Sequence, residues 1–99
     1  MPYHELDPLL HSQLRLAVMS ILVTVKTAEF TDLKDKTGST AGNLSVQLDK
    51  LNQAGYLTIQ KSFKGKYPLT ECTITSKGLE AFENYVKNLS AYINPKKEG

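Results

Sequence analysis

The chain has 99 residues, of which 40% are hydrophobic and 22% are charged, and its formal net charge is +2. This length suits one globular domain, residues 1–99, and no apolar run approaches the roughly 20 residues that a membrane-spanning helix needs. The N-terminus lacks the basic-then-apolar order of a signal peptide and the single cysteine, Cys72, cannot form an intramolecular disulfide, so we expect a cytoplasmic protein.

The basic residues concentrate in the middle of the chain. Residues 26–66 hold seven lysines and four acids, a net charge of +3, whereas residues 1–25 sum to −1 and residues 67–99 to zero. Lys61, Lys64 and Lys66 follow one another without an acid between them. A basic excess confined to one segment is typical of a surface that binds phosphates.

A first helix is predicted to begin at Asp7-Pro8, because proline at the first helical position loses no hydrogen bond. Apolar residues then recur at helical spacing and form one wide stripe: Leu10, Leu14, Ala17, Val18, Ile21, Leu22 and Val25. A second, narrower stripe beside it consists of Leu9, Leu16 and Val23. Two stripes exceed what a small core can use, which favours contact with a second copy of the chain; the alternative is that both stripes lie in the core.

A short second helix is expected from Asp32 to Thr37. The preceding segment, residues 27–30, reads as a connector or a single bridging strand, and Thr31 is the expected helix cap. Gly38 is predicted to end this helix.

The next helix carries the clearest functional signal. Ser39 and Thr40 are candidate caps, Gly55 is the expected terminator, and Leu44, Leu48 and Leu51 form an inward stripe between them. The opposite face consists mainly of small and amide side chains, which can approach base edges without clashing. Together with the preceding helix it matches the helix-turn-helix pattern, and we interpret it as a recognition helix.

A β-hairpin is predicted after Gly55. Residues 56–63 alternate apolar and polar side chains, residues 64–68 read as the turn, and residues 69–75 favour a second strand. The lysines at its tip predict a wing that reaches along the DNA backbone or into the minor groove. The alternative is that these lysines only keep an exposed hairpin soluble.

A long last helix is predicted to start at a cap formed by Thr75 or Ser76. Its apolar positions recur at three- and four-residue steps and are Leu79, Phe82, Val86, Leu89 and Ile93, widened by Tyr85 and Tyr92. A stripe of about five turns is long for a helix that packs on one small core, which predicts a dimerisation helix. Asn94-Pro95 should end it, and residues 96–99 should form a solvated tail.

These elements predict an α+β, mostly α-helical fold: a winged helix-turn-helix with a two-stranded β-wing and a long C-terminal helix. The segments LHSQLRLAVMSIL (10–22), EFTDLKDKTGSTAGNLSVQLDKLNQAGYL (29–57), KSFKGKYPLTECTIT (61–75) and SKGLEAFENYVKNL (76–89) closely resemble the small stand-alone winged-helix DNA-binding proteins related to the MarR and ArsR transcriptional regulators. The T-x-x-G start of the last helix is part of this signature. The resemblance implies a homodimer that binds double-stranded DNA in a sequence-specific manner, with the first and last helices at the interface.

The resemblance also assigns roles to residues. The positions presented to the major groove would be Ser39, Thr40, Asn43, Ser45, Val46, Gln47 and Lys50. The wing residues that contact phosphates would be Lys61, Lys64 and Lys66. The dimer interface would comprise Leu9, Leu16, Val23, Phe82, Tyr85, Val86, Leu89, Tyr92 and Ile93. Asn43 and Gln47 can pair with adenine, and the recognition helix has no arginine to read guanine. The predicted sites therefore contain A·T pairs, or the alternative holds that sequence specificity is low.

Other functions have less support in the sequence. Neither His4 nor His11 has a catalytic partner at a motif spacing, and no cluster of side chains suits a metal, so we expect no enzyme activity, cofactor or metal. Little lies beyond the winged helix itself, which leaves a small-molecule effector without support. A dimeric repressor is the preferred function. The alternative is a winged-helix module that binds another protein without specific DNA binding.

Overall fold

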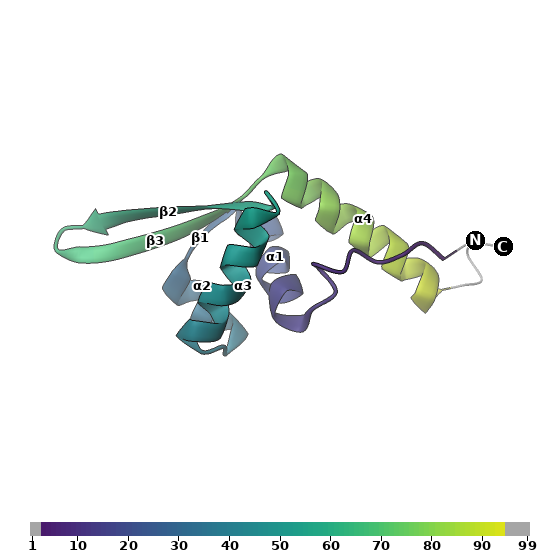
Figure 1. Cartoon of the computed structure of the whole chain (residues 1–99), viewed down its shortest axis with the longest axis horizontal. Coiled ribbons are helices and arrows are strands. Elements are labelled where there is room, and N and C mark those ends of the chain that lie inside the picture. The colour runs from purple at the N-terminus through teal and green to yellow at the C-terminus, as the bar shows by residue number, and fades with distance from the viewer. Residues whose placement is uncertain (1–2, 95–99) are drawn as a thin grey trace.

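The computed structural model describes residues 3–94, so that Pro95 and the predicted tail lie outside the described residues. The elements in chain order are α1 (Gln13–Val25), β1 (Thr27–Glu29), α2 (Phe30–Thr37), α3 (Ala41–Gln53), β2 (Leu57–Lys64), β3 (Tyr67–Ile74) and α4 (Ser76–Ile93). The β2-β3 hairpin extends from one end of the α1-α2-α3 body and α4 from the other, giving extents of 58 × 25 × 21 Å (Figure 1). The predicted winged helix-turn-helix is confirmed.

The core lies where α1, α2 and α3 meet the base of the sheet. Its fully buried side chains are Leu10, Val18, Met19, Leu22, Leu33, Leu44, Leu48, Leu51, Leu57 and Cys72. The three predicted leucines of α3 are among them, and the Thr40 hydroxyl caps α3 by accepting the N–H of Asn43 at 3.2 Å. Burial raises the pKa of the Cys72 thiol to about 11, so this cysteine is protonated at neutral pH.

Helix α1 begins at Gln13, and the predicted start at Asp7 is wrong. Asp7 initiates one turn only, in which its carboxylate accepts the N–H of Leu9 at 2.9 Å and its carbonyl accepts that of His11 at 2.9 Å. The carbonyl of Leu9 then accepts the Nε–H of Arg15 at 2.6 Å, while Ser12 is extended, which interrupts the helix. This break leaves Leu10 fully buried.

Strand β1 adds a third strand to the hairpin, in the order β1-β3-β2, and all pairs are antiparallel. Ala28 of β1 lies opposite Cys72 of β3. Helix α2 follows β1 directly, so Thr31 lies inside the helix instead of capping it. Gly38 ends α2 as predicted, with the positive φ of 67° that glycine adopts without strain.

The wing is longer than predicted, because its turn has only two residues. Lys64 pairs with Tyr67, which leaves Gly65 and Lys66 as the turn, and the positive φ of 65° at Gly65 suits the tight turns of β-hairpins. Strand β1 pairs with β3 only as far as Glu71. Pro68 therefore lies in a part of β3 that is paired on one side, where a missing N–H is tolerated.

A close backbone contact joins α4 to the end of α3. The Thr75 hydroxyl accepts the N–H of Gly78 at 3.0 Å, as predicted for a cap, and donates to the carbonyl of Gly55 at 2.6 Å. The N–H of Thr75 also donates to the carbonyl of Tyr56 at 3.1 Å. Gly78 is buried against that same carbonyl, where a Cβ atom would overlap its oxygen. In the T-x-x-G pattern, the threonine therefore caps α4, and the glycine allows the helix backbone to approach the carbonyl of Tyr56.

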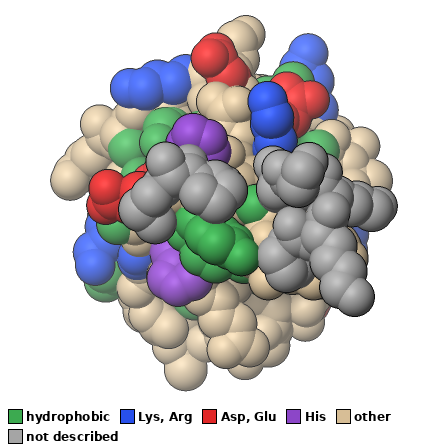
Figure 2. Space-filling model, turned by 90° about the vertical axis from the view of Figure 1, so that its right-hand side faces the viewer, with side chains coloured by type: hydrophobic (Ala, Val, Ile, Leu, Met, Phe, Trp, Pro, Cys, Tyr) green, Lys and Arg blue, Asp and Glu red, His purple; other side chains and the backbone are tan. Residues whose placement is uncertain are grey.

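The N-terminal segment packs along one side of α4. The hydroxyl of Tyr92 donates to the carbonyl of His4 at 2.7 Å, and a 2.9 Å hydrogen bond joins His11 Nδ1 to the hydroxyl of Tyr85. The end-on view shows both histidines beside a group of hydrophobic side chains (Figure 2). None of the helices within residues 3–94 is both long and apolar enough to cross a bilayer.

Replacing Gly78 with alanine should destabilise the protein by about 1–3 kcal/mol, because the new methyl group overlaps the backbone of Tyr56. The matched control is Gly42→Ala in α3, where an added Cβ meets nothing within 4 Å. This control should leave stability unchanged or raise it by up to about 1 kcal/mol. Chemical denaturation of both variants measures the difference, and equal midpoints would contradict the close contact.

Candidate nucleic-acid interface

The exposed side of α3 carries the predicted recognition residues. Its buried leucines face α1 and β2, while Asn43, Ser45, Val46 and Lys50 are exposed on the other side. Val46 is 51% exposed, which is unusual for a valine in the centre of a helix. Thr40 is also exposed, whereas Ser39 is half-buried and bonded to the hydroxyl of Thr37 at 2.8 Å.

An arginine from α1 reaches this face. Nη1 of Arg15 donates a hydrogen bond to Oε1 of Gln47, and Nε2 of Gln47 donates to Oδ1 of Asn43 at 3.0 Å. Because the guanidinium of Arg15 can only donate, this series of two hydrogen bonds fixes the orientation of the Gln47 and Asn43 amides. Both amide oxygens then accept within the protein, and the N–H groups of Asn43 and the second N–H of Gln47 are left as donors.

This polarity matters for base recognition. Pairing with adenine in the major groove needs an acceptor and a donor from the same amide, whereas guanine N7 and O6 and thymine O4 accept hydrogen bonds. The donors left on Asn43 and Gln47 therefore suit acceptor groups. Arg15 was not among the predicted site residues, because it lies 32 positions from Gln47 and no local pattern indicates the contact.

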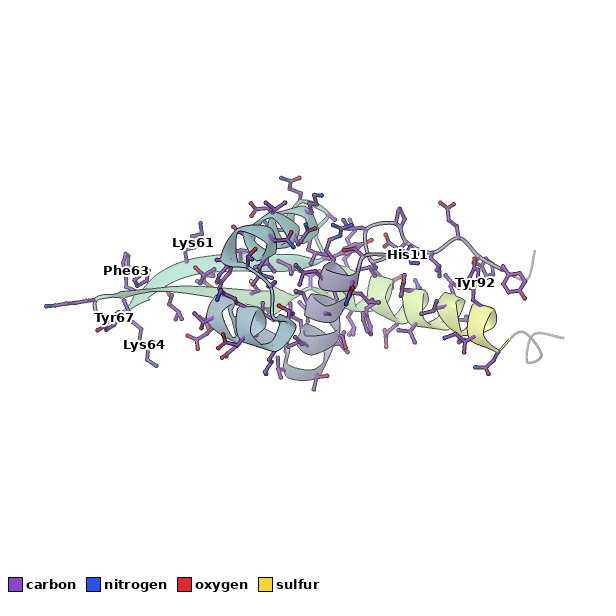
Figure 3. The ribbon with its side chains drawn as sticks, turned by 90° about the horizontal axis from the view of Figure 1, so that it is seen from below. His11, Lys61, Phe63, Lys64, Tyr67 and Tyr92 are labelled. Carbon is purple, nitrogen blue, oxygen red and sulfur yellow. The ribbon has the colours of Figure 1, made fainter. Side chains whose placement is uncertain are left out.

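The wing presents its lysines on both faces. Phe63 lies opposite Pro68 and Lys64 opposite Tyr67 in the antiparallel register, so residues 63 and 64 point to opposite faces. Figure 3 shows Lys61 and Phe63 on one side and Lys64 and Tyr67 on the other. Lys61 also lines a pocket of about 180 Å³ together with Ser45, Leu48, Asp49 and Ile59 among others, so its face of the wing is the one beside α3.

The predicted interface residues fall into two groups. The first points away from the chain's own core: Val23 is 36%, Val86 47%, Tyr92 45% and Ile93 67% exposed. The second is partly buried and packs on the core: Leu9, Leu16, Phe82 and Leu89. Tyr85 differs from both groups, because it is 4% exposed and belongs to the core of its own chain.

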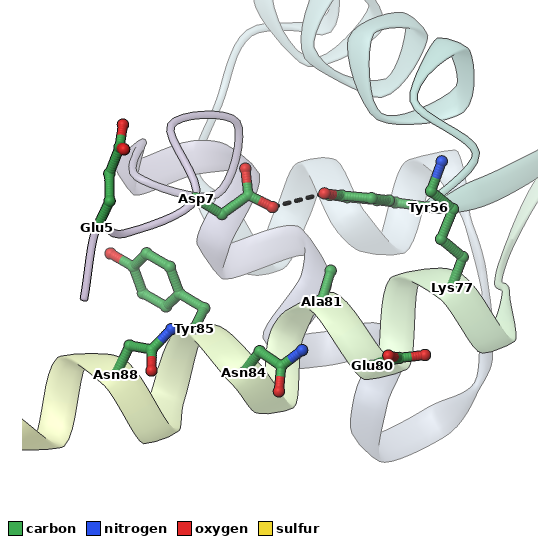
Figure 4. A pocket seen from close by; sticks show the side chains of 9 residues that line it. All are labelled: Glu5, Asp7, Tyr56, Lys77, Glu80, Ala81, Asn84, Tyr85 and Asn88. Atoms are coloured by element: carbon green, nitrogen blue, oxygen red, sulfur yellow. Dashed lines mark hydrogen bonds between the residues drawn. The ribbon is translucent and has the colours of Figure 1, made fainter.

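A polar pocket of about 350 Å³ lies between the N-terminal segment and α4 (Figure 4). Its charged lining consists of Glu5 and Asp7 from the N-terminal segment and Lys77 and Glu80 from α4. The hydroxyl of Tyr56 donates to Oδ2 of Asp7 at 2.5 Å. Desolvation by burial and this hydrogen bond raise the pKa of Tyr56 to about 12. Within residues 3–94, no group of three or more His, Cys, Asp or Glu side chains is placed to hold a metal ion.

Comparison with known proteins gives the same architecture. The chain matches the winged helix DNA-binding domain family over residues 14–93. It is 38% identical over 77 residues to the uncharacterized protein MJ0432 of Methanocaldococcus jannaschii, an alignment that covers 77% of this chain and 83% of that protein.

Solved structures resemble it as well. The transcriptional regulator homologue protein from Pyrococcus horikoshii OT3 superposes with a TM-score of 0.83 at 26% identity, over 88% of this chain and 86% of that one. NadR, solved in complex with 4-hydroxyphenylacetate, shares the fold with a TM-score of 0.70 at 18% identity, over 92% of this chain and 67% of that one. This chain belongs to the winged helix DNA-binding domain family and has the fold of MarR-type transcriptional regulators.

Proposed function

We propose that the protein is a homodimeric transcriptional repressor that binds double-stranded DNA in a sequence-specific manner. The observation that carries this proposal is the pairing of an exposed, donor-rich recognition face on α3 with a lysine-bearing wing beside it. From Lys50 to Thr70 the chain contains four lysines and no acid. Such a surface suits a polyanion.

The proposed contacts divide into two kinds. Asn43, Ser45, Val46 and Lys50 face the major groove, with Val46 able to touch a thymine methyl group. Gln47 acts mainly by holding Asn43. Contacts to phosphates come from Ser39 and Thr40 at the start of α3 and from the wing lysines. They set the register of the protein on the duplex without reading the sequence.

A second copy of the chain is proposed to pack on the outer side of α4. Val86 and Ile93 are exposed there, with the half-buried Phe82 and Leu89 beside them at three- and four-residue steps. The two exposed side chains cost solvation free energy unless a partner covers them. Tyr85 is left out of this interface because its own chain buries it. Repression requires only that the bound dimer covers promoter DNA, whereas activation requires a further contact with another protein. We therefore propose a repressor.

The proposal is tested by selecting bound duplexes from a random library at low salt and determining which sequences are enriched. A dimer should enrich two half-sites whose centres lie about one helical turn, or a multiple of it, apart. If no duplex is enriched over the starting library, DNA binding is excluded, and the protein-binding alternative takes its place.

Replacing Lys64 and Lys66 together with alanine should weaken binding to all duplexes alike. The slope of log affinity against log salt concentration should become shallower by about two per wing, since each phosphate contact contributes about 0.9. Titrations between about 50 and 200 mM salt measure this slope. The control is Lys87→Ala on α4, which should leave the slope unchanged. A change in preferred sequence without a change in slope would contradict the assigned role.

Replacing Arg15 with methionine should alter the base preference of the protein. The change frees Oε1 of Gln47 and lets the amide of Gln47 turn and pair with adenine, which should shift the preference at one position by about tenfold. The control, Arg15→Lys, keeps a donor that can reach Gln47 and should retain the original preference. The measurement is to repeat the selection from the random library with both variants. Identical selected sites for the wild type, Arg15→Met and Arg15→Lys would refute the positioning role of Arg15.

Replacing Val86 with glutamate should convert the dimer to a monomer, because it places a charge in an apolar contact. The side chain is 47% exposed within one chain, so the fold should survive the change. Lys87→Glu is the matched control on the neighbouring position of α4 and should remain dimeric. Sedimentation at micromolar concentration measures the mass. A wild-type monomer, or a dimeric Val86→Glu variant, would show that the interface is elsewhere.

A further inference from the structure

The tip of the wing exposes two aromatic side chains. Phe63 is 74% and Tyr67 78% exposed, and these are the highest values among the large hydrophobic side chains within residues 3–94. They flank the two-residue turn at Gly65 and Lys66. An aromatic ring in water is costly, and a pair at a hairpin tip indicates a surface that a partner covers.

Among the described residues, 3–94, neither ring belongs to the core or packs against it. Strand β1 reaches only to Glu71 of β3, so the outer hairpin has no third strand, and every residue from 61 to 68 is exposed. Threonine at both positions would also form the hairpin, because threonine favours strands as the aromatic residues do and exposes less apolar surface to water. The rings are therefore better explained by binding than by folding.

The charges around the rings identify the kind of partner. Lys61, Lys64 and Lys66 surround the two aromatic side chains, and the nearest acid along β3 is Glu71, close to the base of the wing. A partner with anionic groups on the outside and flat apolar faces within reach fits this arrangement. The phosphates and bases of a nucleic acid have both.

The position of Phe63 indicates a duplex. It shares the face of the wing with Ile59 and Lys61, which is the face beside the recognition helix (Figure 3). When α3 enters the major groove, this face is turned toward the same DNA, and the tip reaches the adjacent minor groove. Tyr67 lies on the opposite face, so the two rings cannot enter the same gap between base pairs.

We infer that Phe63 is a wedge that partly unstacks one base step in the minor groove beside the site read by α3 and bends the DNA there. Tyr67 packs against the sugars of the opposite groove wall, and the lysines hold the flanking phosphates. The inference rests on the proposed DNA binding. Because unstacking is easiest at pyrimidine–purine steps such as TA and CA, the wedge adds a preference for flexible sequence that no hydrogen bond reads.

The test uses the duplex that the wild-type protein enriches from the random library, labelled at its two ends with a donor and an acceptor dye. Wild-type protein should bring the ends closer together. Phe63→Ala should abolish the bend and weaken binding about tenfold or more, with the salt slope unchanged. Phe63→Leu should keep part of the bend, because leucine also serves as an apolar wedge.

Two further measurements separate the wedge from other roles. Ser62→Ala, a neighbouring change on the exposed hairpin, is the control and should bend DNA like the wild type. Two duplexes should be compared, one with a TA step at the position of the wedge and one without it. The wild type should bind the first more tightly, whereas Phe63→Ala should bind both equally. Circular dichroism of Phe63→Ala should match the wild type, since the ring is 74% exposed.

Each contrary result has a definite meaning. If the wild type binds no duplex, the proposed function and the wedge both fail. Binding without bending, or equal bending by Phe63→Ala, refutes the wedge alone. Tighter binding of the separated single strand than of the duplex, lost in Phe63→Ala, would replace the wedge by stacking on unpaired bases. Loss of self-association in Phe63→Ala would assign the tip to a second copy of the chain.

Discussion

The architecture depends on one close contact, between the backbone of Gly78 and the carbonyl of Tyr56, which only a residue without a side chain permits. Thr75 strengthens this junction by bonding to both sides of it. The end of α3, the base of the wing and the start of α4 are therefore held as one unit. If two copies associate through α4, the separation and tilt of their α3 helices follow from this junction, which lies beside the core.

The proposed recognition of DNA would be divided among three elements. Helix α3 presents few charges, and the hydrogen-bond polarity of its face is set from outside by Arg15 of α1. The same arginine binds the carbonyl of Leu9 and interrupts the first helix. One side chain thus links the path of the N-terminal segment to the groups offered to the bases. The wing supplies positive charge, and its tip supplies apolar surface.

Much of the fold could be predicted from the sequence because its signals are local. The cap at Thr40, the leucines of α3, the termination at Gly38 and the start of α4 each depend on residues within a few positions of one another. The pairing of β1 with β3 and the burial of Tyr85 depend on contacts between distant segments. The start of α1 depends on a nearby contact, from Arg15 to the carbonyl of Leu9, that no capping pattern indicates. The sequence predicts Asn43 on the face of α3 that the structure leaves exposed, whereas the orientation of its amide could not be predicted, because Arg15 sets it through Gln47.

The outer half of the wing should open locally at a lower free energy than the rest of the domain. Beyond Glu71 only the bonds between β2 and β3 pair the strands, and residues 61–68 are exposed. Its local opening therefore costs less free energy than unfolding of the domain, and its amide hydrogens should exchange with solvent sooner than those at the base. Warming can fray the tip while the core stays intact. The temperature at which the protein releases a ligand held by the wing then lies below its melting temperature and can vary independently of it.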